Sequence, residues 1–323
     1  MKTTPPRVEA GPFLIYALGG GWGHLTRAAA LTNALPPGPT RILANSPYVQ
    51  IVRAAGMPVE EVTSEAARTM VEEFQGTVIV DTFPRGLMGE LRELLPTLAQ
   101  KKILVHRDLN PKYVEWGKLK EFVALNYDLV LCPGEDGPLA ILEQAHKTEP
   151  WVVREPQVRS SDIVVCASGR PDELGWFGEV AAMLGGHATV RCIAAELPPG
   201  CPQELWVRYW PAIDWIGGAR VVIGGAGYNT VSECTACGVP LIARARPRKY
   251  DRQRLRAQQA GVRVVETPAE AVDLAVKLAR IRPAKIPFRN GAVRTAELIS
   301  TLLHREKSAQ GANPSLPNAV NRP

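Results

Sequence analysis

The feature that most constrains the fold of this chain is a strand–glycine–helix unit that opens residues 221–261. Residues 221–223 (VVI) have the β-branched content of a buried strand. Gly224, Gly225 and Gly227 follow, and a helical stretch begins after them. Glycine lets the backbone approach a ligand closely, and the free N–H groups of a first helical turn point at an anion. The unit predicts an α/β domain, in which this turn either binds an anion or is only a tight connection.

Polar side chains at the start of the predicted helix could serve a ligand. Thr230 and Ser232 would add hydroxyl donors in the first turn, and Glu233, one turn further on, could accept hydrogen bonds from sugar hydroxyls. Neither G-x-x-x-x-G-K-[ST] nor G-x-G-x-x-G is present in this stretch. The glycines alone therefore do not identify what binds.

A second unit of the same kind begins the chain. Residues 13–18 (FLIYAL) indicate a short strand, residues 19–23 are rich in glycine, and a helix follows until Pro36. Open parallel sheets bind ligands beyond the carboxyl ends of their strands, so we expect both glycine turns to line one cleft.

The alternation of short apolar strands with helices predicts parallel sheets joined by right-handed crossovers. Residues 144–161 lack a clear period and carry charges and two prolines, so we place a linker there, and the alternation restarts at residue 162. We expect a first domain over residues 1–150, a second over 151–288, a helix over 289–305 and a disordered tail over 306–323. A helix is also predicted over residues 89–100, with four leucines on one face.

Composition narrows the function less than the motifs do. The net charge of +6 over 323 residues suits an anionic ligand, an acidic membrane surface or nucleic acid. Nucleic acid ranks last, because the chain has no reader motif and no interleaved aromatics. No apolar run is long enough to span a bilayer and no signal core precedes the first strand, which favours the cytoplasm. The Cys234–Cys237 pair lacks further ligands and no Asp-x-Asp motif occurs, so no metal site is expected.

Residues 227–233 (GYNTVSE), 238–240 (GVP) and 251–253 (DRQ) together resemble the donor-binding half of GT-B glycosyltransferases. The resemblance covers about forty residues at consistent spacing and is closest to the bacterial lipid II-type N-acetylglucosaminyltransferases. It implies two Rossmann-like domains facing a cleft, with the first on the acceptor side, the second holding a nucleotide sugar, and the last helix crossing back to the first domain. It also implies roles for donor-binding residues, which are Gly21, Gly23, Ser168, Gly225, Gly227, Asn229, Thr230, Glu233 and Gln253.

Within this resemblance, the glycine turn of the second domain holds the donor diphosphate, Glu233 holds the ribose, and Gln253 meets the donor sugar. His24 takes the place of a histidine that ends the first glycine loop of these enzymes. Imidazole titrates near neutral pH, so His24 could act as the general base that deprotonates the acceptor hydroxyl. A helix cap or a phosphate contact is the alternative for His24.

Several charged residues remain open candidates. Asp81 and Asp108 each follow a predicted strand, and either could orient His24 or replace it as base, or could only cap the chain locally. Arg27 and Arg252 are candidates for neutralising the diphosphate, although Arg27 could instead pair with an acid or lie at the surface. They matter because enzymes of this class often lack a divalent ion, so arginines and helix N–H groups would stabilise the leaving nucleotide.

The resemblance therefore implies an inverting, metal-independent glycosyltransferase that uses a nucleoside-diphosphate sugar, with UDP first among the nucleotides and no further cofactor. The acceptor is open between a small molecule, a glycan and a lipid-linked molecule, the last implying peripheral contact with the inner face of the membrane. The alternative is a nucleotide-sugar hydrolase on the same scaffold, in which water replaces the acceptor. Arg256 stands where the family has an asparagine, so the identity of the sugar is open.

Overall fold

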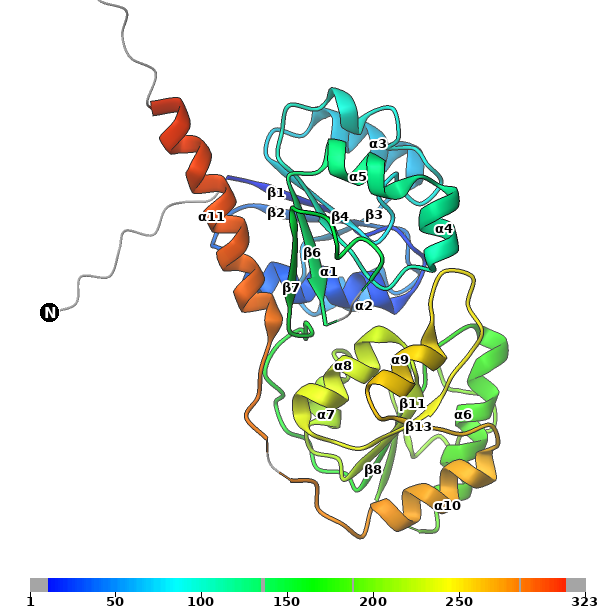
Figure 1. Cartoon of the computed structure of the whole chain (residues 1–323). Coiled ribbons are helices and arrows are strands. Elements are labelled where there is room, and N and C mark those ends of the chain that lie inside the picture. The colour runs from blue at the N-terminus through cyan, green and yellow to red at the C-terminus, as the bar shows by residue number, and fades with distance from the viewer. Residues whose placement is uncertain (1–10, 135–136, 188, 285, 312–323) are drawn as a thin grey trace, which may run out of the picture.

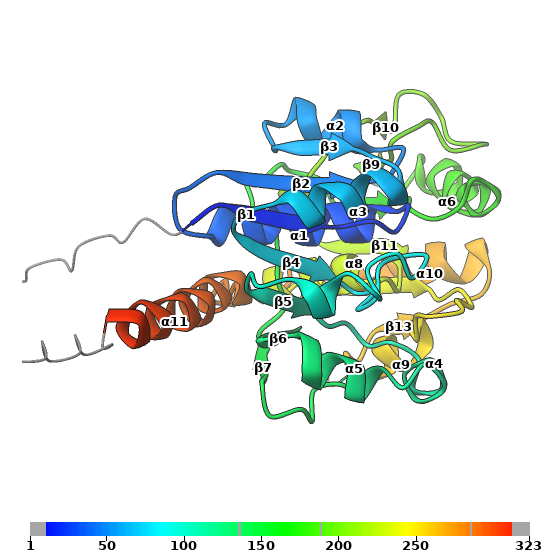
Figure 2. The same ribbon diagram turned by 90° about the horizontal axis from the view of Figure 1, so that it is seen from above.

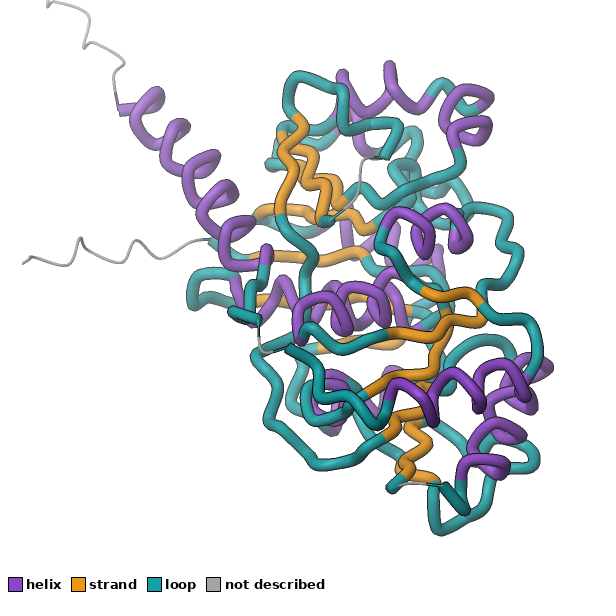
Figure 3. Tube along the Cα trace, turned by 60° about the horizontal axis from the view of Figure 1, so that its bottom comes forward, coloured by secondary structure: helices purple, strands orange, loops and turns teal. Residues whose placement is uncertain are grey.

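The computed structural model describes residues 11–134, 137–187, 189–284 and 286–311. These residues form two lobes, each built on a parallel sheet with helices packed against it (Figure 1). Figure 3 shows the strands of each lobe in orange, enclosed by helices and loops. The predicted α/β class with two parallel sheets is confirmed.

The first sheet has seven strands in the order β3-β2-β1-β4-β5-β6-β7. Their bounds are β1 Phe13–Tyr16, β2 Thr40–Ala44, β3 Val59–Glu61, β4 Thr77–Asp81, β5 Lys102–Val105, β6 Leu129–Pro133 and β7 Ala145–Thr148. The central strands are buried on both faces, which is why they appear in the sequence as continuous apolar runs. The helices of this lobe are α1 Trp22–Ala34, α2 Val49–Ala54, α3 Ser64–Glu73, α4 Pro111–Trp116 and α5 Leu119–Asn126.

The second sheet has six strands in the order β10-β9-β8-β11-β12-β13. Their bounds are β8 Ile163–Cys166, β9 Val190–Ile193, β10 Trp206–Val207, β11 Val221–Gly225, β12 Leu241–Arg244 and β13 Arg263–Val264. The helices are α6 Pro171–Leu184, α7 Ile213–Ile216, α8 Tyr228–Cys237, α9 Gln253–Gln259 and α10 Pro268–Leu278. Each sheet reverses its order of connection next to its first strand, β1 or β8, and this is where open α/β sheets bind ligands.

The last helix, α11 (Gly291–Gly311), returns to the first lobe. Ala292 and Ile299 are fully buried there in the same core as residues of α1. The chain before α11 lies beside the chain after β7, where Asn290 exchanges hydrogen bonds with the backbone of Val152. Figure 2, seen from above, shows the far end of α11 running out to one side of the sheets.

Three sequence predictions need correction. The helix over residues 89–100 does not form, because the chain turns there and has only the short 3-10 helix η1 (Leu95–Thr97) around Pro96. Leu91, Leu94 and Leu95 are buried in the core of the first lobe, so these side chains are not available for contact with a membrane. The stretch 144–161 contains β7, which completes the first sheet. The tail predicted from residue 306 begins inside α11, and residues 312–323 and 1–10 lie outside the described residues.

Candidate functional site

The two glycine turns face each other across the boundary between the lobes. β1 leads into α1 and β11 leads into α8, and these two helices begin on opposite sides of the boundary (Figure 1). The Asn229 side-chain amide, in the first turn of α8, donates a hydrogen bond of 3.4 Å to the carbonyl of Gly23, in the first turn of α1. The sequence prediction that both turns line one site therefore agrees with this geometry.

A cavity of about 160 Å³ lies between these helix starts. Residues of both lobes line it, among them Trp22, Gly23, Thr26, Arg107, Ser168, Gly227, Asn229, Thr230 and Glu233. Gly21 is the N-cap residue of α1, directly before Trp22, which lines the cavity. A Cβ atom on Gly225 would lie 3.7 Å from the Ser168 hydroxyl. Most donor-binding residues expected from the sequence are thus close together, on the carboxyl ends of the strands.

Close packing explains two of the glycines. A Cβ atom on Gly224 would lie 2.9 Å from Cγ2 of Thr230, so a side chain there would displace the first turn of α8. A Cβ atom on Gly19 would lie 2.0 Å from Nε2 of His24, so the imidazole can occupy its position only beside a glycine. The glycine pattern of the sequence therefore reflects space needed by site residues as well as turn conformation.

Two polar groups at the cavity have no partner among the described residues. Glu233 is only 4% exposed and makes no hydrogen bond there, and burial, helped by the nearby Asp214 carboxylate, raises its pKa to about 8. Oδ1 of Asn229 is buried and also lacks a partner within the described part of the chain. Buried polar atoms are usually satisfied, so these groups indicate that the cavity receives a polar ligand.

His24 belongs to a buried ionic cluster with Asp81 and Arg27. Its Nδ1 lies 2.5 Å from Oδ2 of Asp81, while Arg27 donates to both oxygens of the same carboxylate at 2.9 and 2.6 Å. Thr82, at a positive φ of 72°, accepts a further hydrogen bond from Arg27. Asp81, at the end of β4, is therefore the acid that orients His24.

The electrostatics of the cluster keep His24 neutral. Burial lowers the pKa of His24 and outweighs the opposing effect of Asp81. Burial alone would raise the pKa of Asp81, but the charge of Arg27 and the hydrogen bonds from His24 and Arg27 hold it below its usual range. Because Nδ1 faces a carboxylate, it carries the proton in this geometry, and Nε2 is the nitrogen able to accept one.

Two sequence candidates are placed elsewhere. Asp108 accepts hydrogen bonds from Nε of Arg252 at 3.0 and 2.9 Å, so its carboxylate joins the lobes and does not orient His24. Arg252 is held there and does not line the cavity. Arg27 is buried against Asp81, which fits the predicted pairing with an acid and excludes the surface role. Its contact with a phosphate stays a prediction.

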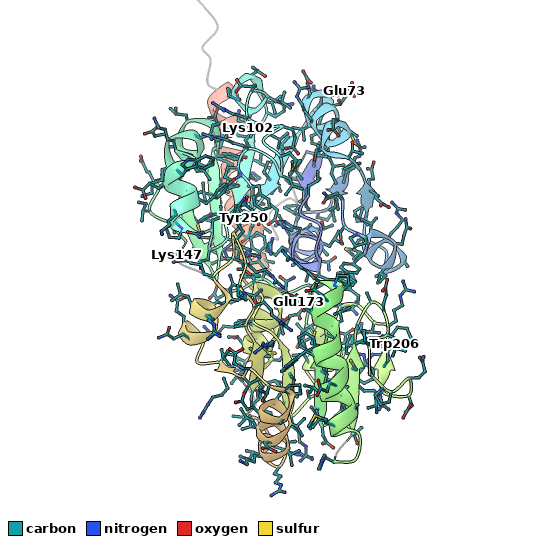
Figure 4. The ribbon with its side chains drawn as sticks, turned by 90° about the vertical axis from the view of Figure 1, so that its right-hand side faces the viewer. Glu73, Lys102, Lys147, Glu173, Trp206 and Tyr250 are labelled. Carbon is teal, nitrogen blue, oxygen red and sulfur yellow. The ribbon has the colours of Figure 1, made fainter. Side chains whose placement is uncertain are left out.

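Residues 245–252, which connect β12 to α9 and which we call the interlobe loop, contact the first lobe. Arg107 donates to Asp251 at 2.7 Å, so Arg107–Asp251 and Asp108–Arg252 form two ion pairs of opposite polarity. The Tyr250 ring packs against those of Phe83 and Tyr113, with ring centroids 5.8 and 4.9 Å away. Figure 4 labels Tyr250 where the two lobes meet. Phe83 in turn stacks on His24 at 5.8 Å. The loop thus brings the second lobe next to the candidate base.

Gln253 begins α9, directly after the interlobe loop. Its side-chain oxygen accepts from the backbone N–H of Arg246 at 2.9 Å, and its amide donates to Asp251 at 3.3 Å. It does not line the cavity. Its contact with a donor sugar stays a prediction.

Sequence reasoning missed Arg107, which lines the cavity and stands two positions after the end of β5. Its place just after a buried strand is a sequence signal that could have identified it. His106, also in this stretch, is buried and accepts from the Leu139 N–H, and burial lowers its pKa to about 3, which indicates a structural role.

The described residues contain neither a cluster of metal-ligating side chains nor a helix suited to span a membrane. No group of three or more His, Cys, Asp or Glu side chains in the described ranges could hold a metal ion. Among the described helices, none is both long and apolar enough to cross a membrane.

Comparison with known proteins identifies the fold. The sequence matches no known family model and no curated protein. Among solved structures, the calicheamicin glycosyltransferase CalG4 is similar with a TM-score of 0.56 and 16% identity, over 92% of this chain and 100% of that chain. MurG from Acinetobacter baumannii has a TM-score of 0.52 and 12% identity, over 91% and 100%. A putative UDP-N-acetylglucosamine 2-epimerase from Listeria monocytogenes has a TM-score of 0.56 and 13% identity, over 93% and 98%.

These proteins are described with different activities, and their identities to this chain are low, so the likeness concerns architecture. The resemblance to GT-B glycosyltransferases seen in the sequence is confirmed at this level. The chain has the GT-B fold, with two parallel α/β lobes whose glycine turns meet across a cavity.

Proposed function

We propose that the protein is an inverting glycosyltransferase that moves a sugar from a nucleoside-diphosphate donor to an acceptor hydroxyl. The observation that carries this proposal is the His24–Asp81 pair, in which His24 directly follows Gly23, a residue that lines the cavity between the two glycine turns. His24 itself is not among the residues that line this cavity. GT-B neighbours that include two glycosyltransferases and a putative UDP-sugar enzyme support it. UDP is therefore the first nucleotide to test.

The donor would bind mainly to the second lobe. The N–H groups at the start of α8, with the Thr230 hydroxyl, suit a diphosphate, because the positive end of the helix dipole faces the cavity. Glu233, buried and without a protein partner among the described residues, suits the hydroxyls of a ribose. Its raised pKa leaves it largely protonated at neutral pH, so it could donate as well as accept.

The transfer step would use His24 as base. Nε2 of His24 takes the proton of the acceptor hydroxyl while the acceptor oxygen bonds to the anomeric carbon. The bond from that carbon to the diphosphate oxygen breaks on the opposite face, and its electron pair leaves with the nucleoside diphosphate. Asp81 holds the ring in the correct tautomer and stabilises the imidazolium that forms.

The proposal includes metal independence, no further cofactor and a cytoplasmic site of action. The acceptor, whether a small molecule, a glycan or a lipid-linked molecule, is left to experiment. If water is the acceptor, the same site would make the protein a nucleotide-sugar hydrolase.

A thermal-shift panel of UDP-, dTDP- and GDP-sugars tests the donor site, because a ligand that binds the native state raises its melting temperature. We expect one nucleotide to give a clear shift, and the absence of any shift would sink the proposal. Release of nucleoside diphosphate without an acceptor would indicate a hydrolase. His24→Ala should lose turnover and keep donor binding, whereas His146→Ala, an exposed histidine on β7, should keep both.

A further inference from the structure

We propose that Arg107, supplied by the first lobe, is the cation that neutralises the departing diphosphate. This inference rests on the proposed function and deepens it, because it names the residue that stabilises the leaving group. It also replaces Arg27 and Arg252, the arginines that the sequence favoured for this task.

The position of Arg107 carries the first part of the argument. Among the described residues that line the cavity, Arg107 is the only arginine or lysine. Its side chain is 12% exposed, and Nη1 lies 3.9 Å from where a Cβ on Gly23 would stand, close to the first turn of α1. The first turn of α8 lines the same cavity through Gly227 and Asn229. A diphosphate held by α8 would therefore lie within reach of this guanidinium.

A chain of contacts ties Arg107 to the glycine turn of the second lobe. Nη2 of Arg107 donates to Oδ1 of Asp251 at 2.7 Å, and Arg256 donates to the same oxygen at 2.6 Å. Arg256 is buried and also donates to the carbonyl of Ala226, inside the glycine turn, at 3.1 Å. Asp251 and Arg256 thus act as positioning residues.

Most of the other arginines near the boundary are held by carboxylates away from the cavity. Arg246 has no carboxylate partner among the described residues, and it does not line the cavity. Arg27 is bound to Asp81 and Arg252 to Asp108. The same holds for three further arginines between residues 244 and 254. Arg248 forms an ion pair with Glu173, which Figure 4 labels on α6. Arg244 and Arg254 both form ion pairs with Glu266. These acids therefore neutralise Arg244, Arg248 and Arg254.

The chemistry explains why a fixed cation is useful at this place. When the bond between the anomeric carbon and the diphosphate oxygen breaks, the electron pair stays on that oxygen and negative charge grows on the leaving group. A guanidinium held in place beforehand stabilises that charge without having to reorganise, and it can bind phosphate oxygens in a bidentate manner. No bond forms to Arg107, and no proton is transferred to or from it.

The test compares Arg107→Gln with Arg107→Lys and with Arg252→Gln as the matched control. Arg252→Gln removes the other ion pair between the same two segments without altering the cavity lining. Calorimetry measures the affinity for the nucleoside diphosphate selected by the panel and for its monophosphate, UDP and UMP if uridine is selected. We expect Arg107→Gln to reduce the ratio of these affinities by about 10- to 100-fold and kcat by about 10²- to 10³-fold. Arg107→Lys should recover part of both.

Three results would overturn the inference. The ratio could stay unchanged in Arg107→Gln although the wild type prefers the diphosphate, in which case the proposed function stands and the role of Arg107 does not. The ratio could fall equally in Arg252→Gln, which would assign the effect to lobe closure. If the wild-type protein binds no nucleoside diphosphate at all, the proposed function fails first and this inference fails with it.

Discussion

At the residue scale, the chemistry of the site depends on which charged groups are already paired. Asp81 is shared by His24 and Arg27, and Asp251 is shared by Arg107 and Arg256. Glu233 has no such partner among the described residues and sits in the cavity as a largely protonated acid. The site therefore combines a candidate base, a cation and a largely protonated acid, and substitutions test each of them.

Replacing Asp81 with Asn tests the pairing with His24. The substitution keeps the shape but removes the charge that orients the ring, so we expect kcat to fall about 10²- to 10⁴-fold. The kcat/KM of the wild type should fall only below pH 6.5, because burial lowers the pKa of His24. Asp81 opposes that lowering, so in Asp81→Asn the acid limb should move to lower pH. Rate profiles measure both effects, and an acid limb that moves upward would contradict the assignment.

Stability against pH tests the state of Glu233. The folded pKa of about 8 lies above the unfolded value of 4.5, so the folded protein holds a proton that the unfolded chain releases. The contribution of Glu233 to the free energy of unfolding is fully present below pH 4.5. This contribution is lost as the pH rises toward 8, at up to about 1.4 kcal/mol per pH unit. The melting temperature of the wild type should therefore fall relative to Glu233→Gln between pH 5 and 8. The exposed Glu73→Gln is the control, and parallel curves for all three proteins would refute the prediction.

At the scale of elements, the sequence predicted those helices, strands and turns whose signals lie in residues close together in the chain. The turns after β1 and β11 were recognised because glycine, strand and helix signals follow one another within a few positions. The helix over residues 89–100 was wrong because four leucines with helical spacing can also be buried by a turning chain, and Pro96 restricts the backbone. Short helices such as α4 and α5 were not predicted at all.

The contacts of the interlobe loop could not be predicted for a different reason. Arg107 and Asp251 are separated by 144 residues, and so are Asp108 and Arg252. Local patterns cannot show that a basic run will meet acids from another lobe. The single sequence therefore suggested phosphate binding for Arg252, which the fold assigns to an ion pair.

A double-mutant cycle on Asp108→Asn and Arg252→Gln tests this ion pair. Asp108 is 6% exposed and Arg252 is 31% exposed, so each single substitution should cost about 1–3 kcal/mol, much of it from the partner left unpaired. The double variant should lose less than the sum, with a coupling of about 0.5–3 kcal/mol. Chemical unfolding measures both quantities. The exposed pair Arg294–Glu297 on α11 is the control, for which we expect little coupling.

At the scale of the whole molecule, two chain segments connect the lobes, and the second one carries α11 back to the first lobe. Ile299 is fully buried there, next to residues of α1 and the first sheet. The C-terminal helix, although it follows the second lobe in sequence, is therefore part of the core of the first. The described part of the chain therefore begins and ends in the first lobe, and the cavity lies between two lobes that each have their own hydrophobic core.

Ile299→Ala should consequently weaken the first lobe and not the second. Removing a fully buried isoleucine leaves a cavity in the core and typically costs about 2–5 kcal/mol. Hydrogen exchange followed by mass spectrometry should show faster exchange in β1, β4 and α1, while β8, β11 and α8 keep their protection. Val293→Ala, on the exposed side of the same helix with 59% of its surface accessible, should change neither set. Equal loss of protection in both lobes would mean that they unfold as one unit, and the separate packing inferred from their cores would be wrong.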